Sequence, residues 1–356
     1  MNADAPVLIM AGGTGGHIFP GLAVADELRA RHIAVIWLGS RTGLENRLVP
    51  QHGIPLERID ISGVRGRGLR TLLGLPLRLT RAVLAARRVL RQHRPRSVLA
   101  LGGYAAAPGG IAAWLARIPL VVHEQNAVAG RTNRLLARRA TRVLGGFDGV
   151  LRNAEWVGNP VRAAISAVAA PERRYGSREG ALRLLVLGGS QGAQSLNLAV
   201  PEVVRQCGAR LGVQVRHQSG QAHFDRAREA YRAAGVDAQV VPFEPDMAGA
   251  YAWADVVICR AGALTLAELA AAGVPAILVP FPHAVDDHQT RNAQAMVDAG
   301  GARLVPEGAD FTARLMAALE DIGERGRLLE MARRARTLAR PEATKRIADV
   351  CLEVAS

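Results

Sequence analysis

Short apolar runs alternate along the chain with longer stretches in which apolar residues recur at helical spacing. The first run, residues 7–10, is followed at once by a glycine-rich turn and then by a helical stretch over residues 20–31. Buried parallel strands have short continuous apolar sequences, and such strands are joined by crossover helices. The alternation therefore predicts α/β units with mostly parallel sheets.

The pattern begins a second time in the middle of the chain. The predicted strands of the first half lie at residues 7–10, 34–38, 97–101, 120–123 and 142–144. Those of the second half lie at residues 184–187, 213–217, 238–242, 256–259 and 276–279. A glycine-rich turn again follows the first strand of the second half. This weak internal repeat predicts two similar domains.

We expect two Rossmann-like, doubly wound domains over residues 1–158 and 159–336, followed by a helix over residues 337–356. The last segment has apolar residues at helical spacing, so we expect it to pack back on a domain face. Residues 171–180 are polar and have the composition of a hinge or linker. Open α/β sheets bind ligands at the carboxyl ends of their strands, so both domains should face one central cleft.

The charge balance indicates an anionic partner. Lys and Arg number 45 against 31 Asp and Glu, which gives a formal net charge of +14. Nucleic acid, phosphate-bearing substrates and anionic lipid all fit this balance. Hydrophobic residues make up 49% of the chain and charged residues 21%, which excludes a disordered or collagen-like protein.

The cysteines and the apolar runs indicate in which cellular compartment the protein is expected. Three cysteines lie far apart, with the spacing neither of a disulfide framework nor of a metal site, and this favours a reducing cytoplasm. The first apolar run is too short for a signal sequence, and no run reaches the ~18 residues that span a bilayer. If a membrane is involved, we expect the protein to lie on its surface.

The turn Gly12-Gly-Thr-Gly-Gly-His17 joins the first predicted strand to the first helix. Glycines let backbone N–H groups approach an anion, and a helix N-terminus adds partial positive charge, so the turn suits a phosphate cradle. A tight turn that serves packing alone is the alternative. His17 has the chemistry of a general base or a diphosphate ligand, although a histidine at a helix start also occurs without any chemical role.

The turn does not match two common nucleotide-binding patterns. No G-x-G-x-x-G register fits, because Ile18 stands where the third glycine belongs, and the G-x-x-x-x-G-K-[ST] loop is missing from the sequence. Ser40-Arg41 follows the second predicted strand, where an arginine can accept the 2′-phosphate of NADP. This pair is the only support for an NADPH-dependent oxidoreductase.

The segment Arg260-Ala-Gly-Ala-Leu-Thr-Leu-Ala-Glu268 follows a predicted strand and opens a helix. Thr265 and Glu268 have the spacing of a capping box, which explains Glu268 as a helix cap. In the functional interpretation, the first N–H groups of the helix hold a diphosphate, and Glu268 turns to a ribose. These N–H groups belong to Ala263, Leu264 and Thr265.

A polar loop over residues 280–292 is expected to line the cleft. Its side chains of metal-ligand type are His283, Asp286, Asp287 and His288. Loop residues so close in sequence often point apart, and no aspartate pair has the D-x-D spacing of cation-dependent sugar transferases. A clamp on sugar hydroxyls by Gln289 and Asn292 suits the side chains better.

Other polar groups also follow predicted strands. They are Gly102-Gly-Tyr104, His123-Glu-Gln-Asn126 and the segment Gly158-Asn-Pro-Val-Arg162. Arg162 has the charge to clamp a phosphate, and an exposed surface arginine is the alternative.

Residues 61–96 contain ten arginines and no acidic residue. Apolar residues alternate with them at near-helical spacing, namely Leu72, Leu75, Leu79, Val83 and Leu90. One interpretation is a core helix with a solvated basic face. The other is a surface that docks on anionic lipid headgroups. Aromatic residues make up only 4% of the chain, so nucleic-acid binding by stacking is a weaker alternative.

Taken together, these motifs resemble glycosyltransferase family 28, and within it the bacterial enzymes that add N-acetylglucosamine (GlcNAc) in peptidoglycan synthesis. The resemblance extends over essentially the whole chain. It implies an α/β protein of the GT-B fold, with the acceptor and the membrane bound by the first domain and the donor by the second. The implied reaction is an inverting transfer of GlcNAc from UDP-GlcNAc to undecaprenyl-pyrophosphoryl-MurNAc-pentapeptide (lipid I), which forms lipid II.

The same resemblance implies residue roles. The nucleotide diphosphate and ribose would be held by Arg162, Ser190, Ala263, Leu264, Thr265, Leu266, Ala267 and Glu268, with uracil read near Glu244. Asn126 and Gln289 would contact the GlcNAc, and the cleft would be lined by Thr14, Gly15 and Gly16. His17 would be the base or the ligand of the acceptor diphosphate. Ala261 departs from the family pattern, in which serine is common.

No metal or cofactor is implied, because helix N-termini can stabilise the departing UDP. The expected partners are UDP-GlcNAc, lipid I and an anionic phospholipid surface, without nucleic acid, at the cytoplasmic face of the inner membrane. The alternatives are the oxidoreductase and a non-catalytic basic protein that binds lipid or nucleic acid. Other GT-B transferases and UDP-sugar epimerases would share the donor loops.

Overall fold

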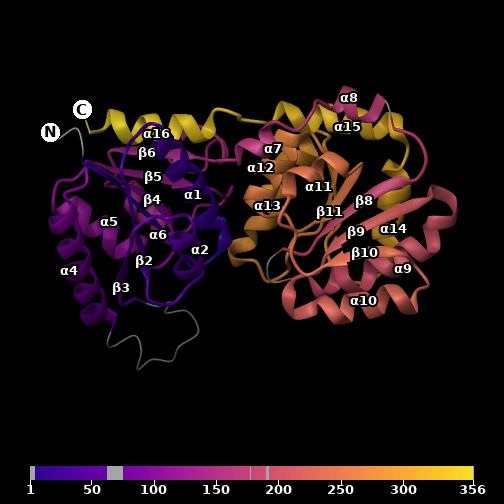
Figure 1. The fold of residues 1–356 in the computed structure, drawn as a ribbon, viewed down its shortest axis with the longest axis horizontal. Helices are drawn as coiled ribbons and strands as arrows, with labels where there is room; N and C mark the ends of the chain where they lie inside the picture. The colour runs from indigo at the N-terminus through magenta and orange to yellow at the C-terminus, as the bar shows by residue number, and fades with distance from the viewer. Residues whose placement is uncertain (1–4, 62–74, 177, 190–191, 356) are drawn as a thin grey trace. The chain divides into compact units, whose positions relative to one another are not determined.

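The computed structural model describes residues 5–61, 75–176, 178–189 and 192–355 (Figure 1). The chain divides into two compact units. The N-terminal unit comprises residues 1–160 together with residues 341–356, and the C-terminal unit comprises residues 161–340. Each unit is a parallel sheet covered by helices on both faces, which confirms the predicted class of two Rossmann-like domains.

The N-terminal sheet has the strand order β3-β2-β1-β4-β5-β6-β7, with every described pair parallel. Its strands are β1 (Val7–Ala11), β2 (Val35–Ser40), β3 (Leu56–Ile59), β4 (Ser97–Gly102), β5 (Leu120–Glu124), β6 (Arg142–Gly145) and β7 (Glu155–Trp156). The order reverses between β1 and β4. The loops that follow these two strands therefore flank the crevice where such sheets bind ligands.

Helices of the N-terminal unit pack on the two faces of this sheet and enclose separate apolar clusters. They are α1 (Gly15–Ala30), α2 (Glu45–Gln51), α4 (Leu75–His93), α5 (Ala106–Leu115), α6 (Arg131–Ala137) and α16 (Ala343–Glu353). The last of them comes from the end of the chain. Ile347, Val350 and Cys351 of α16 are fully buried in the cluster that also contains residues of α1. Trp37 of β2 lies in the same cluster, and its indole N–H donates to the Ala11 carbonyl at 2.8 Å.

The C-terminal sheet is parallel in all its described pairs and has the strand order β10-β9-β8-β11-β12-β13. Its strands are β8 (Leu182–Leu187), β9 (Val213–Gln218), β10 (Ala238–Val241), β11 (Val256–Cys259), β12 (Ala276–Leu278) and β13 (Ala302–Leu304). Here the order reverses between β8 and β11. The glycine turn after β8 and the segment 260–262 after β11 therefore occupy the same place as the β1 and β4 loops of the other unit.

The helices of the C-terminal unit are α7 (Ala163–Ser166), α8 (Pro171–Gly176), α9 (Gln194–Leu211), α10 (Phe224–Ala233), α11 (Met247–Trp253), α12 (Ala263–Ala272), α13 (His288–Asp298), α14 (Phe311–Ile322) and α15 (Arg325–Thr337). Of these, α8, α9, α10, α14 and α15 contribute buried residues to one large apolar cluster. Single turns of 3-10 helix occur at Gln221–His223 and Val285–Asp287. No helix within the described ranges is both long enough and apolar enough to cross a bilayer.

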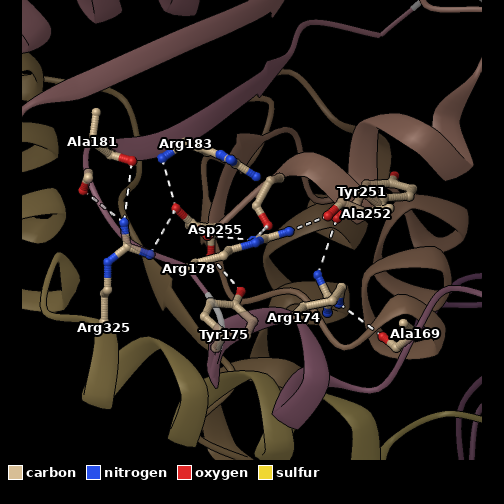
Figure 2. A network of polar contacts seen from close by, with 12 residues as sticks. Ala169, Arg174, Tyr175, Arg178, Ala181, Arg183, Tyr251, Ala252, Asp255 and Arg325 are labelled. Carbon is tan, nitrogen blue, oxygen red and sulfur yellow. Dashed lines mark hydrogen bonds and ion pairs between the residues drawn. The ribbon is translucent and has the colours of Figure 1, made fainter.

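The described residues of the stretch 171–180 lie within the C-terminal unit and form no linker between the units, so this sequence-based expectation is wrong. Residues 171–176 form α8, and two arginines of the stretch are almost fully buried in a polar network (Figure 2). The Arg174 guanidinium donates to the carbonyls of Ala272 and Gly273, at 2.7 and 2.5 Å, where α12 ends. A cation that satisfies the last carbonyls of a helix also interacts favourably with the helix dipole. Two of the arginines in this polar stretch therefore serve buried hydrogen bonds.

Asp255 lies at the centre of this network and is fully buried (Figure 2). Its carboxylate forms an ion pair with Arg178, lies 3.7 Å from the guanidinium of Arg325, and accepts a hydrogen bond from the Arg183 N–H at 2.9 Å. The carbonyl of the same residue accepts from the Tyr175 hydroxyl at 2.6 Å. Through its carboxylate and its carbonyl, Asp255 thus links α8, β8 and α15 to the start of β11.

We expect Asp255→Ala to destabilise the C-terminal unit by about 3–5 kcal/mol, because it leaves the buried Arg178 without its counter-charge. Urea unfolding monitored by circular dichroism measures the loss. The exposed Asp237→Ala in the same unit is the matched control, and its effect should stay within about 0.5 kcal/mol. Equal stability of the two variants would contradict the role given to Asp255.

Candidate active site

The loops that follow β1 and β4 touch each other through their backbones. A Cβ atom on Gly103, whose φ is +88°, would lie 2.4 Å from the carbonyl oxygen of Gly12, so no side chain fits between the two loops. A Cβ atom on Gly102 would lie 2.8 Å from Cε1 of His17. The imidazole of His17 therefore rests against the bare backbone at the end of β4. The glycines serve this close approach as well as the turn itself.

A buried carboxylate holds the first glycine turn. Glu45 is fully buried, and its Oε2 accepts the N–H of Gly13 at 3.0 Å. Its Oε1 accepts the N–H of Ser40 at 3.0 Å and lies 2.7 Å from the Ser40 hydroxyl. Ser40 is therefore engaged by a carboxylate, and the structure adds nothing to the NADP interpretation. Sequence reasoning missed Glu45 because no local spacing rule connects it with a residue 32 positions away.

Because the Gly13 N–H donates to Glu45, fewer N–H groups of the turn are left to bind a phosphate than the sequence predicted. Helix α1 begins at Gly15, and its N-cap residue Thr14 makes no side-chain capping hydrogen bond. The first N–H groups of a helix have no acceptor within the helix. The donors that this turn can offer to an anion are therefore those at the start of α1, around Thr14, Gly15 and Gly16.

Glu124 plays the corresponding role in the loop after β5. This carboxylate is 1% exposed. Its Oε1 accepts the backbone N–H of Asn126 at 3.0 Å, and its Oε2 accepts the N–H of Gly130 at 3.0 Å and Nδ2 of Asn133 at 2.9 Å. The loop is thereby held in one conformation. The side-chain amide of Asn126 also lies 3.3 Å from Oε1, so Glu124 positions the residue expected to contact GlcNAc.

His17 is brought to this loop by its side chain. Nδ1 of His17 lies 2.9 Å from Oε1 of Gln125. The other end of the Gln125 amide, Nε2, lies 3.1 Å from Nδ1 of His123. His123 is fully buried, and its Nε2 lies 2.9 Å from the carbonyl oxygen of Gly158. Burial lowers the pKa of His123 to about 4, so this imidazole is neutral at pH 7. The structure thus brings His17, Gln125 and His123 into one hydrogen-bonded row.

In the C-terminal unit the predicted capping box is wrong. Helix α12 begins at Ala263, with Gly262 as its N-cap residue, so Thr265 lies inside the first turn. The unsatisfied N–H groups of this turn are those of Ala263, Leu264 and Thr265, as the functional interpretation requires. The N–H of Leu266 already donates to the carbonyl of Gly262 at 3.0 Å, and the Leu266 side chain is buried.

The carboxylate of Glu268 is held by two side chains. Its Oε1 accepts a hydrogen bond from the Arg162 guanidinium at 2.9 Å, and its Oε2 accepts from the Tyr251 hydroxyl at 3.0 Å. Arg162 is 45% exposed, and the side chain of Glu268 is 17% exposed. An arginine and a carboxylate, the types that bind phosphate and ribose hydroxyls, therefore stand side by side about one helical turn from the N-terminus of α12.

Tyr251 is a member of this site that sequence reasoning missed. It is fully buried in α11, and burial together with the nearby Glu268 carboxylate raises its pKa, so the hydroxyl keeps its proton and donates. In the sequence it is one aromatic residue in an apolar helical stretch, which is the pattern of a core side chain. Only its hydroxyl distinguishes it from such a residue.

The remaining predicted positions are more dispersed. Ser190 lies outside the described residues. Glu244 precedes α11, and its Oε1 accepts the N–H of Asp246 at 2.9 Å. The Gln289 side chain accepts the N–H of Phe281 at 2.9 Å and thereby closes the loop before α13. Ala267 lies between Leu266 and Glu268 on α12 and is half-buried.

Asn292 does not form the predicted sugar clamp with Gln289. Its side chain is fully buried, and its Nδ2 donates to the carbonyl of Ala261 at 3.2 Å, so it supports the turn before α12. Across the part of the chain that the structure describes, no three His, Cys, Asp or Glu side chains gather as metal ligands.

Helix α4 belongs to the predicted basic stretch, of which residues 62–74, including Leu72, lie outside the described residues. Val83 and Leu90 pack against the core, as a core helix requires. The opposite face is exposed and carries Leu77 and Leu84, with Arg78, Arg81 and Arg88 around them. On the neighbouring α5, Trp114 and Leu115 are also exposed. We call this set of seven residues the α4–α5 surface.

A pocket of about 700 Å³ adjoins the α4–α5 surface at the carboxyl ends of the two helices. The basic residues that line it are Arg87, Arg91, Arg94 and Arg117. Its other lining residues are apolar, and no acidic residue is among them. The pocket therefore extends the basic character of α4, which itself contains no Asp or Glu.

Two parallel, doubly wound sheets, each with a glycine turn after its first strand and polar side chains at its strand ends, are the two domains of the GT-B fold. The chain belongs to glycosyltransferase family 28. The N-terminal domain of this family matches residues 7–145, and its C-terminal domain matches residues 183–347.

Similar proteins cover almost the whole chain. A protein of Dechloromonas aromatica is 53% identical over 98% of this chain and 99% of its own length, and one of Halorhodospira halophila is 55% identical over 98% of both chains. Each is a UDP-N-acetylglucosamine--N-acetylmuramyl-(pentapeptide) pyrophosphoryl-undecaprenol N-acetylglucosamine transferase. The crystal structure of Acinetobacter baumannii MurG is similar with a TM-score of 0.83 and 39% identity, covering 98% of this chain and 99% of that one.

The buried neutral imidazole of His123 predicts a loss of stability in acid. In the unfolded chain His123 takes up a proton near its ordinary pKa of 6.5, whereas in the folded unit it does so only near 4. The unfolded state therefore binds more protons between these values. The N-terminal unit should lose up to about 3 kcal/mol through this residue as the pH falls from 6.5 to 4.

Urea unfolding at pH 7, 6, 5 and 4, followed by tryptophan fluorescence, measures this dependence. In His123→Gln the acid-induced loss should be smaller, even though the variant is less stable at pH 7. The exposed His52→Gln should keep the pH dependence of the parent protein. The same slope in His123→Gln and in the parent would contradict the assignment.

Proposed function

We propose that this protein transfers GlcNAc from UDP-GlcNAc to the muramoyl sugar of undecaprenyl-pyrophosphoryl-MurNAc-pentapeptide, lipid I, and so forms lipid II in peptidoglycan synthesis. The observation that carries the proposal is the full-length identity of 53–55% to transferases named for this reaction, with both family 28 domains present. In the reaction an acceptor hydroxyl attacks C1 of GlcNAc, the bond from C1 to the diphosphate breaks, and UDP leaves with the electron pair.

The C-terminal unit would bind the donor. The N–H groups of Ala263, Leu264 and Thr265 would face the diphosphate, where the helix dipole of α12 favours negative charge. Arg162 would add a cation to the phosphates, while Glu268 would accept hydrogen bonds from the ribose hydroxyls. Negative charge on the departing UDP would thus be stabilised by fixed dipoles and a guanidinium, with no metal ion required.

The remaining donor contacts would come from the surrounding loops. Ser190, in the glycine turn after β8, would add a hydroxyl to the phosphate contacts, and the backbone near Glu244 would read the uracil. Leu266 and Ala267 would shape the site through their place on α12, because the Leu266 N–H is used within the helix. Gln289 would contact the GlcNAc hydroxyls.

The N-terminal unit would bind the acceptor. The start of α1, at Thr14, Gly15 and Gly16, would face an acceptor group, and Asn126 would contact the transferred sugar. His17 would remove the proton from the attacking hydroxyl, since an imidazole is well suited to exchange a proton near pH 7.

Release of UDP from UDP-GlcNAc, with and without a lipid I analogue, tests the proposed reaction. In detergent and EDTA, release should require the acceptor and should not depend on added Mg²⁺. Release without the acceptor would indicate an epimerase or a hydrolase. No release under either condition would favour the non-catalytic binding protein.

Glu268→Ala should raise the KM for UDP-GlcNAc about tenfold or more with a smaller effect on kcat, because hydrogen bonds to a charged group contribute roughly 1.5–3 kcal/mol. Initial rates at varied donor concentration measure both constants. The exposed Glu330→Ala, in the same unit, is the matched control and should leave them unchanged. A donor KM equal to that of the parent would limit Glu268 to a structural role.

We further propose that the α4–α5 surface docks on anionic phospholipid at the cytoplasmic face of the inner membrane. An anchored acceptor such as lipid I requires the enzyme to work at a membrane surface. Exposed Leu77, Leu84 and Trp114 supply apolar contacts, and the arginines around them supply attraction to headgroups of about 1 kcal/mol each near the surface. The guanidinium of Arg139 over the Trp114 ring, 5.2 Å from its centroid, adds another cation to this surface.

Leu84→Asp should reduce sedimentation with vesicles that contain anionic lipid by about tenfold, because it removes an apolar contact and adds a charge that headgroups repel. Leu198→Asp changes another exposed leucine, on α9 of the other unit, and should bind vesicles as the parent does. Turnover of a short-chain, water-soluble acceptor should be the same in all three proteins. Unchanged sedimentation of Leu84→Asp would place the membrane contact elsewhere.

A further inference from the structure

The side-chain amide of Gln125 has only one orientation that satisfies its neighbours. The amide is 1% exposed, and its Nε2 lies 3.0 Å from the carbonyl oxygen of His123. A carbonyl oxygen only accepts, so the group that faces it must be the NH₂ end of the amide. The oxygen Oε1 is then the end that faces Nδ1 of His17, 2.9 Å away.

The ring of His123 enforces the same orientation. Its Nε2 lies 2.9 Å from the carbonyl oxygen of Gly158, and this pair requires a proton on Nε2. Because the buried ring is neutral, its Nδ1 carries a lone pair and accepts from Nε2 of Gln125, 3.1 Å away. If the Gln125 amide were flipped, its oxygen would face two acceptors, the carbonyl oxygen and Nδ1 of His123. The Gln125 backbone is fixed as well, since its carbonyl accepts from Asn159 at 2.9 Å.

We propose that Gln125, oriented by His123, is a positioning residue that keeps a proton on Nδ1 of His17 and leaves Nε2 as the nitrogen that works on the substrate. An amide oxygen only accepts, so Nδ1 must be the protonated nitrogen of the neutral ring. The lone pair then lies on Nε2. This inference rests on the proposed function, in which His17 is the base.

The contact of His17 with β4 supports a fixed ring. Its Cε1, Nδ1 and Nε2 would lie 2.8, 3.0 and 3.1 Å from a Cβ atom built on Gly102, so the imidazole rests flat against that backbone. With one side against the strand end and Nδ1 bonded to Gln125, Nε2 is the nitrogen left to receive a proton.

The proposed row also suits the proton transfer. As the acceptor oxygen forms its bond to C1 of GlcNAc, its proton passes to the Nε2 lone pair, and the electron pair of the broken C1–O bond leaves with UDP. His17 then carries two N–H groups. Its Nδ1–H still donates to Gln125 Oε1, so the row does not rearrange during the step. The other tautomer would place a proton on Nε2 and could not accept one there.

Nitrogen NMR of protein with ¹⁵N-labelled histidine tests the proposal without any substrate. Long-range ¹H–¹⁵N correlations distinguish the two neutral tautomers, and His17→Asn identifies the His17 signals among the nine histidines. In the parent protein the neutral His17 ring should be protonated on Nδ1. Protonation on Nε2 would overturn the proposal, and this measurement requires no variant of Gln125 to fold.

Gln125→Met removes the acceptor and keeps the length of the side chain. The variant should show a mixture of His17 tautomers, and its kcat should fall by about tenfold or more with an unchanged donor KM, since general base catalysis contributes roughly 10²–10⁴-fold. Gln51→Met, an exposed change in the same unit, is the control for both readouts.

The two readouts separate this inference from the proposed function. A change of tautomer in Gln125→Met with an unchanged kcat would overturn the positioning role of Gln125. A parent protein that releases no UDP with the lipid I analogue would contradict the proposed function, while its His17 spectrum would still report whether Gln125 sets the tautomer.

Discussion

Glu45 and Glu124 are buried carboxylates whose oxygens accept the N–H groups of loops that leave the N-terminal sheet. A buried carboxylate is costly unless hydrogen bonds compensate it, and here backbone and side-chain donors do so. The constraint acts in both directions. The carboxylates need the loops in order to stay buried, and the loops need the carboxylates, because a loop has no sheet partners for its backbone groups. These hydrogen bonds between buried carboxylates and loop N–H groups fix the positions of His17, Gln125 and Asn126.

The C-terminal unit holds its central helix by different means. Arg174 covers the last carbonyls of α12, and Arg162 and Tyr251 hold Glu268 in its middle. Its N-terminal N–H groups are left for a ligand. A cation at the carboxyl end and an open amino end both agree with the direction of the helix dipole. The donor site would therefore be rigid where charge develops, which is the condition for electrostatic stabilisation without reorganisation.

All ten strands predicted from the hydrophobic pattern are present in the structure, and the predicted class of fold is confirmed. Buried parallel strands leave a strong local signal in the sequence. The pattern missed β3, β7 and β13, which lie at the edges of the sheets. The prediction of a linker at residues 171–180 was wrong because the polar residues there bind carbonyls far away in sequence, at Ala272 and Gly273. Thr265 and Glu268 matched a capping box by spacing, but the helix starts two residues before Thr265.

In the candidate site, too, local sequence patterns indicated some residues and missed others that depend on contacts across the fold. Residues that follow strands, such as His17, Asn126 and Glu268, were named as candidates from their place in the pattern. Glu45 and Tyr251 were not, since their importance lies in contacts with residues far away in the sequence.

Helix α16 is a further long-range feature: it belongs to the N-terminal unit although residues 161–340 separate it from the rest. A ribosome makes residues 347–351 only after residues 161–340. The core around Trp37 therefore stays open until the C-terminal unit has been made, and that unit can complete its fold before the N-terminal one.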